Sequence, residues 1–231
     1  MSGLARRLLW PGLTTVAMLA LAIWLGVWQV QRLHWKTALL DEIDRGEASP
    51  AIPLPADPRP FTKVRVEGTL RQDLAALYGT ELRVTAAGPT LGAFLLNPLE
   101  RPGAPDIIVD RGWVPNDVPR PTFPVRAAVE GYIRPAEHPL RFGVADDPAV
   151  RRFYALDPVA IAASLGVQEV APFTLVALGT VPRGTYPEPA SALPRPVNNH
   201  LMYAITWFSL GATLVAVFVA FVRSQRAEPS G

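Results

Sequence analysis

Two long uncharged apolar runs, residues 8–31 and 201–222, lie near the two ends of the chain. At about 1.5 Å per residue in an α-helix, each run is long enough to cross a hydrocarbon core about 30 Å thick. The polar residues Asn198 to His200 stand immediately before the second run. We therefore expect two transmembrane helices, over residues 8–31 and 198–222.

Between these runs the pattern changes to short alternating stretches, which are typical of β-strands. One helix is well signalled, with Asp157 as its N-cap, Pro158 in its first turn and Gly166 as its stop. We expect residues 61–197 to form a mainly antiparallel β barrel or sandwich of the α+β class. A juxtamembrane segment and an extended proline-rich spacer, residues 32–60, would precede it. The strand candidates are residues 64–70, 91–96, 107–109, 125–133 and 173–178.

The first apolar run has a rival interpretation as a cleaved signal peptide. Residues 20–22, Ala-Leu-Ala, have the small-x-small form of a cleavage site. The run continues beyond that site through Val27, however, and is longer than the apolar core of a signal peptide. We therefore favour a membrane span.

Two spans place both chain ends, residues 1–7 and 223–231, on one side of the membrane. Basic residues cluster on the cytoplasmic side of membrane proteins, so the basic residues near these ends predict cytoplasmic termini and an outer central domain. Arg32 and Lys36, at the other end of the first span, act against this orientation. The terminal basic residues are Arg6, Arg7, Arg223 and Arg226.

Composition agrees with a membrane protein, because apolar residues make up 49% of the 231 residues and charged residues only 18%. The mean hydropathy is +0.19. The net charge is only +2 and the arginines are scattered, so no nucleic-acid partner is expected. The chain has no cysteine, which excludes disulfides, thiolate metal sites and cysteine nucleophiles.

The sequence lacks a nucleophile elbow, a phosphate loop, a zinc-protease motif and a dinucleotide fingerprint, so we expect no enzyme. Glu137-His138 and Asp146-Asp147 are the local groups that resemble acid/base or metal-binding residues, and we expect them to be solvated surface. A membrane-tethered hydrolase is a remaining hypothesis that rests on them alone. The stretch Asp110 to Pro115 predicts a rigid corner, because a strand there meets a charged pair, Gly, Trp and Pro.

At the start of the second apolar run, small and aromatic residues and one histidine share a helix face and form a stripe along it. At about 100° per residue, His200, Ala204, Trp207 and Gly211 share one helix face, with Tyr203 beside it. Near the outer end of the first run, Trp28, Arg32 and Trp35 lie within about 60° of one another, flanked by Gln29 and Lys36, while His34 points away. A simpler interpretation is an interfacial aromatic belt with snorkelling basic side chains and a helix-capping histidine.

Three separated motifs stand out: Gly26-Val27-Trp28-Gln29 with Arg32, Trp35 and Lys36; Val109 to Pro115; and Asn199-His200-Leu201 with Tyr203-Ala204 and Thr206-Trp207. Together they resemble the surfeit locus protein 1 family of terminal-oxidase assembly factors. Their order and the two-helix frame match this family as well. Asp110 stands where the family usually has Asn, and His34 occupies a variable position.

The resemblance implies a cytochrome c oxidase assembly factor that binds haem A and passes it to oxidase subunit I. It implies a cell inner membrane location with a periplasmic domain, and as partners subunit I, other assembly or haem A synthesis proteins, and membrane lipid. The family's haem-associated histidine resembles His200, with Trp207 beside it. Neutral imidazole is an iron ligand, so His200 is the expected ligand of the haem iron.

We expect Tyr203, Trp207 and Arg32 to complete the cofactor site, with Arg32 or Lys36 pairing the haem propionates. Whether His34 is a second axial ligand stays open. The competing hypothesis is a cofactor-free membrane scaffold that stabilises subunit I or other assembly factors. Ala204 and Gly211 suit that hypothesis equally well, because small residues let helices approach closely.

Overall fold

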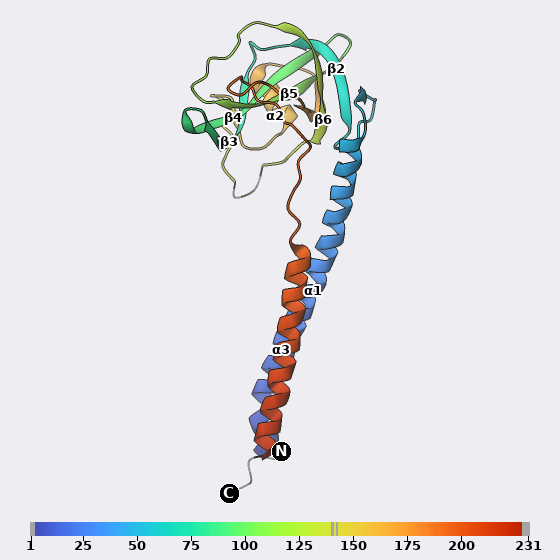
Figure 1. Cartoon of the computed structure of the whole chain (residues 1–231), viewed down its shortest axis with the longest axis vertical. Helices are drawn as coiled ribbons and strands as arrows, with labels where there is room; N and C mark the ends of the chain where they lie inside the picture. The colour runs from blue at the N-terminus through green and yellow to red at the C-terminus, as the bar shows by residue number, and fades with distance from the viewer. Residues whose placement is uncertain (1–2, 140, 142, 228–231) are drawn as a thin grey trace. The chain divides into compact units, whose positions relative to one another are not determined.

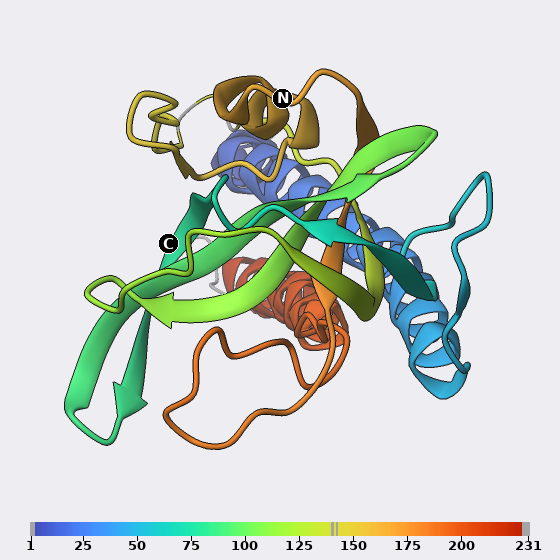
Figure 2. The same cartoon turned by 90° about the horizontal axis from the view of Figure 1, so that it is seen from above.

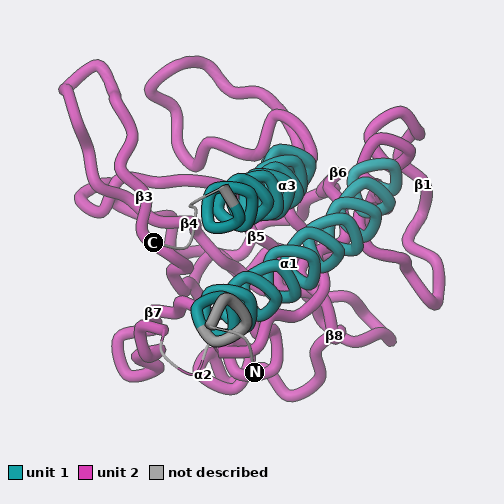
Figure 3. The backbone as a smooth tube through the Cα atoms, turned by 90° about the horizontal axis from the view of Figure 1, so that it is seen from below, with its two compact units in different colours: residues 1–42, 195–231 teal, residues 43–194 magenta. Residues whose placement is uncertain are grey.

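The computed structural model describes residues 3–139, 141 and 143–227. The chain forms two compact units, which Figure 3 colours separately. Unit 1 contains residues 1–42 and 195–231, and unit 2 contains residues 43–194. Each unit is described by itself.

Two long helices, α1 (Gly3–Ala48) and α3 (His200–Ala227), make up most of unit 1 (Figure 1), although residues 43–48 at the end of α1 belong to unit 2. The segments Arg7–Ala48 and His200–Arg226 are both long and apolar enough to cross a membrane, as the two uncharged runs predict. α1 is longer than the span expected from the apolar run. Residues 32–48 contain no proline, and their one glycine, Gly46, lies in the last turn of α1, so the helix continues beyond the apolar residues.

α1 and α3 lie side by side and antiparallel, as Figures 1 and 3 show. A Cβ atom at Gly12 would contact Phe218, and one at Gly211 would contact Leu19 and Ala22. From Ala204 to Phe218, the least exposed positions of α3 recur with alternating spacings of three and four residues, which is the pattern of a helix pair packed along a narrow seam. These positions are Ala204, Trp207, Gly211, Leu214 and Phe218.

Unit 2 contains a coiled eight-stranded sheet (Figure 2). Strands β2, β6, β8, β5 and β4 pair in that order, and β2 also pairs with β4, so they close into a ring. All pairs in the ring are antiparallel except β5 with β8. The expected mainly antiparallel domain is confirmed, and of its two expected forms, barrel or sandwich, the closed ring is a barrel. The elements are β1 (Ile52–Pro53), β2 (Lys63–Leu70), β3 (Ala76–Thr85), β4 (Gly88–Arg101), β5 (Ala104–Pro115), β6 (Val125–Pro135), β7 (Arg152–Phe153), α2 (Pro158–Leu165) and β8 (Val170–Ala177).

Strand β5 is buried on both faces, which explains its continuous apolar run. Ile107 and Val109 join the core inside the ring, together with Leu175 of β8. Ile108 points to the opposite face and packs with Ile161 of α2 in a second core. Because successive side chains alternate between faces, a strand between two cores must be apolar at every position.

Helix α2 forms where its end signals predict it. The Asp157 side chain accepts hydrogen bonds from the backbone N–H groups of Val159 and Ala160. Gly166 ends the helix with a φ of 75°, in the left-handed region that glycine adopts without strain. Local chemistry is sufficient to define this element.

Three features of unit 2 differ from the expectations. Strand β3 (Ala76–Thr85) has no counterpart among the strand candidates. Its pairing with β4 is irregular between Tyr78 and Glu81, and such a bulge interrupts the alternation of side chains that predicts a strand. The expected corner at Asp110 to Pro115 is wrong, because these residues continue β5 and pair with β4. The proline-rich segment belongs to unit 2, where Ile52 pairs in parallel with Val64, instead of standing apart as a spacer.

Candidate functional site

His200, the first residue of α3, forms a short hydrogen bond to α1 within unit 1. Its Nδ1 atom lies 2.7 Å from Oε1 of Gln29. A carbonyl oxygen can only accept, so Nδ1 carries the proton and donates. A neutral imidazole has one N–H and one lone pair, and the lone pair is therefore on Nε2. This is the tautomer in which Nε2 is available to a metal ion.

One aromatic ring contacts this imidazole, and further aromatic and basic side chains lie on the same two helices. Trp28 meets His200 edge-on, with ring centroids 6.5 Å apart and an interplanar angle of 85°. Tyr203 is 54% exposed, and Trp207 is half-buried on the seam. The Arg32 guanidinium stacks on Trp35, 4.9 Å from the ring centroid. Its exposed charge remains accessible to an anionic group from outside.

The structure divides the predicted stripe into two parts. Ala204 is buried and Gly211 packs against Leu19 and Ala22, so this part of the stripe is occupied by α1. A porphyrin therefore has no free surface there. His200 and the partly exposed edge of Trp207 remain available.

His34, the open candidate for a second ligand, is exposed on α1. At about 100° per residue it lies roughly 140° around the helix from Gln29. The two histidines therefore do not share the face where Gln29 meets His200.

Sequence reasoning missed the role of Gln29, which it placed only beside the Trp28, Arg32 and Trp35 face. Gln29 is 9% exposed and belongs to the seam between the helices. The available signal was a polar residue inside an otherwise apolar run, where lipid or a neighbouring helix would favour a hydrocarbon side chain.

In unit 2, hydrogen bonds from the motif Asp110 to Trp113 hold neighbouring segments together. The buried Asp110 carboxylate accepts a hydrogen bond of 2.9 Å from the Gly112 N–H. Trp113 is fully buried, its Nε1 donates to the Glu81 carbonyl, and its backbone bonds in both directions to Glu188. Burial raises the pKa of Asp110 to about 6. The motif joins the barrel wall to the segment around Glu188.

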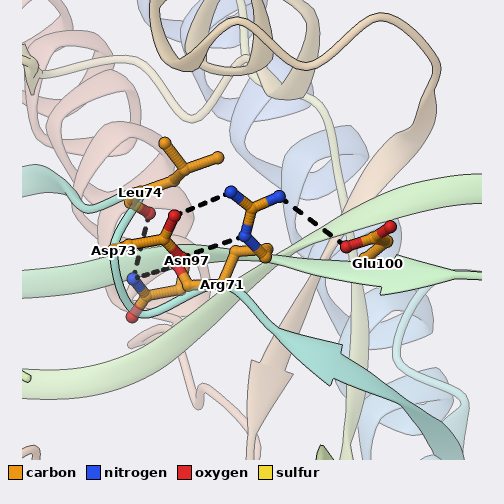
Figure 4. A network of polar contacts seen from close by, with 5 residues as sticks. All are labelled: Arg71, Asp73, Leu74, Asn97 and Glu100. Carbon is orange, nitrogen blue, oxygen red and sulfur yellow. Dashed lines mark hydrogen bonds and ion pairs between the residues drawn. The ribbon is translucent and has the colours of Figure 1, made fainter. Parts of the chain in front are cut away.

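A second polar cluster closes the turn between β2 and β3 (Figure 4). The Arg71 guanidinium donates to both carboxylate oxygens of Asp73, and this holds the pKa of Asp73 below its usual value. The amide of Asn97, which is buried, donates to the carbonyls of Arg71 and Leu74. These bonds satisfy the backbone of the turn, so the cluster has a structural role.

The acidic groups behind the hydrolase hypothesis have structural partners. Glu137 accepts from the Arg134 guanidinium at 2.6 Å and from the Tyr78 hydroxyl at 3.1 Å. Asp146 accepts from backbone N–H groups at Tyr154 and Ala155. Among the described residues, no group of three or more His, Asp and Glu side chains is arranged to hold a metal ion.

Comparison with known proteins gives a match to one family over most of the chain. A model of the SURF1 family matches residues 16–212. A SURF1-like protein of Rickettsia bellii is 28% identical over 221 residues, which cover 92% of this chain and 90% of the relative. Surfeit locus protein 1 of Homo sapiens is 28% identical over 229 residues, covering 87% and 74%. Surfeit locus protein 1 of Rattus norvegicus is 31% identical over 230 residues, covering 88% and 73%.

Proposed function

The chain belongs to the SURF1 family, and on this premise we propose that it is an assembly factor for haem-copper oxidases that binds haem A and delivers it to oxidase subunit I. It acts as a chaperone for the cofactor and not as an enzyme. The observation that carries the proposal is the Nδ1 bond from His200 to Gln29, because it leaves Nε2 of a neutral imidazole available.

The residues around His200 fit a haem. Bound haem A would supply an iron atom that takes an axial imidazole ligand. His200 would provide that ligand, while Trp28, Tyr203 and the edge of Trp207 would offer aromatic surface to the macrocycle. The exposed Arg32 guanidinium suits the haem propionates, because it can bind carboxylates through two parallel hydrogen bonds.

The exposure of these groups suits delivery to another protein. Tyr203 and Trp28 are 54% and 42% exposed, and the seam itself is filled by the two helices. A haem bound beside the seam can leave without separation of α1 from α3. A transfer protein needs such an exchangeable ligand set, whereas an oxidase core encloses its haem.

We further propose that unit 1 spans the cell inner membrane with both termini in the cytoplasm, and that unit 2, the sheet domain, lies in the periplasm. The antiparallel helix pair, with Gly12 opposite Phe218, brings the start of α1 and the end of α3 to the same side. Arg7, Arg223 and Arg226 lie near these ends, and basic residues are enriched on the cytoplasmic side.

An optical spectrum of the detergent-solubilised full chain, co-expressed with the haem A synthesis enzymes, tests the haem proposal. The wild type is expected to carry haem A, and His200→Ala is expected to lose it. His138→Ala is the matched control, because His138 lies in the sheet domain outside unit 1. Equal haem in the wild type and His200→Ala, or none in a wild type under conditions that load a known binder, would reject the proposal.

A cofactor-free scaffold is the second candidate function. One observation favours it: the hairpin of β3 and β4 exposes apolar side chains that the sheet domain leaves uncovered. Leu82 pairs across the hairpin with Leu91, both are at least half exposed, and the neighbouring Val84 is 86% exposed. A photo-crosslinking residue at Val84 is expected to capture subunit I if this hairpin contacts the oxidase. Crosslinking to subunit I without any bound haem would favour the scaffold.

A further inference from the structure

Gln29 is a polar side chain enclosed between two apolar helices. Its exposed fraction is only 9%, and Gly26, one turn before it on the same seam, packs against Phe208. A buried amide without hydrogen bonds costs free energy, so its position on the seam requires a partner. The Nδ1–H of His200 provides that partner across a sequence separation of 171 residues.

The hydrogen bond controls two properties of the imidazole. It places the proton on Nδ1, because the amide oxygen accepts but cannot donate. Together with the edge contact from Trp28 it also fixes the plane of the ring. Histidines that bind metals commonly donate their other N–H to a neighbouring acceptor, which orients the ring and raises its basicity.

We propose that Gln29 is a positioning residue that holds His200 in the Nδ1–H tautomer and presents its Nε2 atom to the haem iron. This inference rests on the proposed haem function and deepens it, because it makes α1 a part of the ligand system. The haem site then depends on the register of the two helices as well as on His200 itself.

Nuclear magnetic resonance of ¹⁵N-histidine-labelled protein without haem tests the tautomer directly. The chain has only three histidines, His34, His138 and His200, so the His200 signals are identified by their loss in His200→Ala. The measurement uses the full chain in detergent micelles at mildly alkaline pH. The wild type is expected to show the Nδ1–H form at His200. A predominant Nε2–H form would overturn the inference.

Three variants connect the tautomer to haem binding. Gln29→Leu removes the acceptor and is expected to lose the tautomer preference and to weaken haem A binding by about 10–100-fold. Gln29→Glu keeps an acceptor, so it is expected to retain the Nδ1–H form and to lower the reduction potential of the bound haem through a more basic imidazole. Gln31→Leu, at an exposed position of the same helix, is the control and is expected to behave as the wild type.

The outcomes separate this inference from the proposed function. If His200→Ala loses haem A while Gln29→Leu binds it with unchanged affinity, the positioning role is overturned and the haem function stands. An unchanged potential in Gln29→Glu would also overturn the role, because a merely structural glutamine would not tune the iron. If the wild type binds no haem A, both proposals fail.

Discussion

The ring of Phe208 fills the space that a side chain at Gly26 would need. A Cβ atom at position 26 would lie 2.7 Å from Cε1 and 2.8 Å from Cζ of that ring, which is closer than carbon atoms approach without a shift. Gly26 precedes Gln29 by one helical turn on the seam, so this contact helps to set the separation at which Gln29 meets His200.

Gly26→Val is expected to push α1 and α3 apart at this point, at a cost of about 1–3 kcal/mol, because Phe208 cannot be accommodated beside a branched side chain. A disulfide between Thr37→Cys and Asn198→Cys measures the separation, since Oγ1 of Thr37 and Nδ2 of Asn198 are 3.5 Å apart and the chain has no other cysteine. The disulfide yield is expected to fall.

Gly12→Ala is the control for this helix contact. Its Cβ would lie 3.6 Å from Phe218, an ordinary van der Waals distance, so the disulfide yield should not change. Adding Phe208→Ala to Gly26→Val should restore the yield. An unchanged yield in Gly26→Val alone would show that the helices do not depend on this close approach.

Asp110→Asn is expected to stabilise the sheet domain at neutral pH. Burial raises the pKa of Asp110 from 3.8 to about 6, so between these pH values the folded state binds more protons than the unfolded state. The stabilisation of the folded state by the protonated Asp110 carboxyl is therefore fully present below about pH 4. It is lost as the pH rises to about 6, and the unfolding free energy falls by about 3 kcal/mol in total. The neutral amide still accepts from the Gly112 N–H and removes this pH dependence.

Thermal unfolding of the detergent-solubilised full chain across this pH range checks the prediction for Asp110. Near-ultraviolet circular dichroism reports on buried aromatic groups such as Trp113, next to the motif. Asp117→Asn, at an exposed position shortly after β5, is expected to leave the profile unchanged. A steeper loss of stability with rising pH in Asp110→Asn would contradict the assignment.

Gly112→Ala is expected to destabilise the sheet domain by at least about 3 kcal/mol. Gly112 has a φ of 112°, and a Cβ atom there would collide with the backbone of Glu188 and Pro189. Gly103→Ala separates the cost of the positive φ from the cost of the collision. The φ of Gly103 is 77°, but no atom lies within 4 Å of the added Cβ. We expect it to cost only about 1 kcal/mol, measured as a smaller fall in melting temperature. Equal losses would show that only the backbone conformation matters.

Thr174→Val is expected to raise the stability of the barrel by about 1 kcal/mol. Thr174 is fully buried in β8, and its Oγ1 atom has no hydrogen-bond partner among the described residues. Valine has a similar shape and removes the uncompensated hydroxyl. Thr85→Val, which removes a hydroxyl bonded to the Gly88 carbonyl, should instead lower the melting temperature. A loss of stability in Thr174→Val would mean that its hydroxyl is satisfied.

Elements defined by local chemistry could be predicted from the sequence. The two spans follow from the length of the uncharged runs, and α2 follows from the caps Asp157 and Gly166, because these signals act within one or two helical turns. The alternation from Val64 to Leu70 likewise predicts β2, since one face of this strand is buried. His200 was recognised as a candidate ligand because its motif is contiguous in the sequence.

Only the tertiary structure decided which groups meet across the fold. Ala204 and Gly211 share a helix face with His200, but their contact with α1 makes that face a packing seam instead of an open surface for a porphyrin. The partnership of Gln29 with His200 depends on the register of two helices far apart in the chain. That register comes from the fit of side chains such as Phe208 onto Gly26, and this is a property of two surfaces in contact that neither segment carries alone.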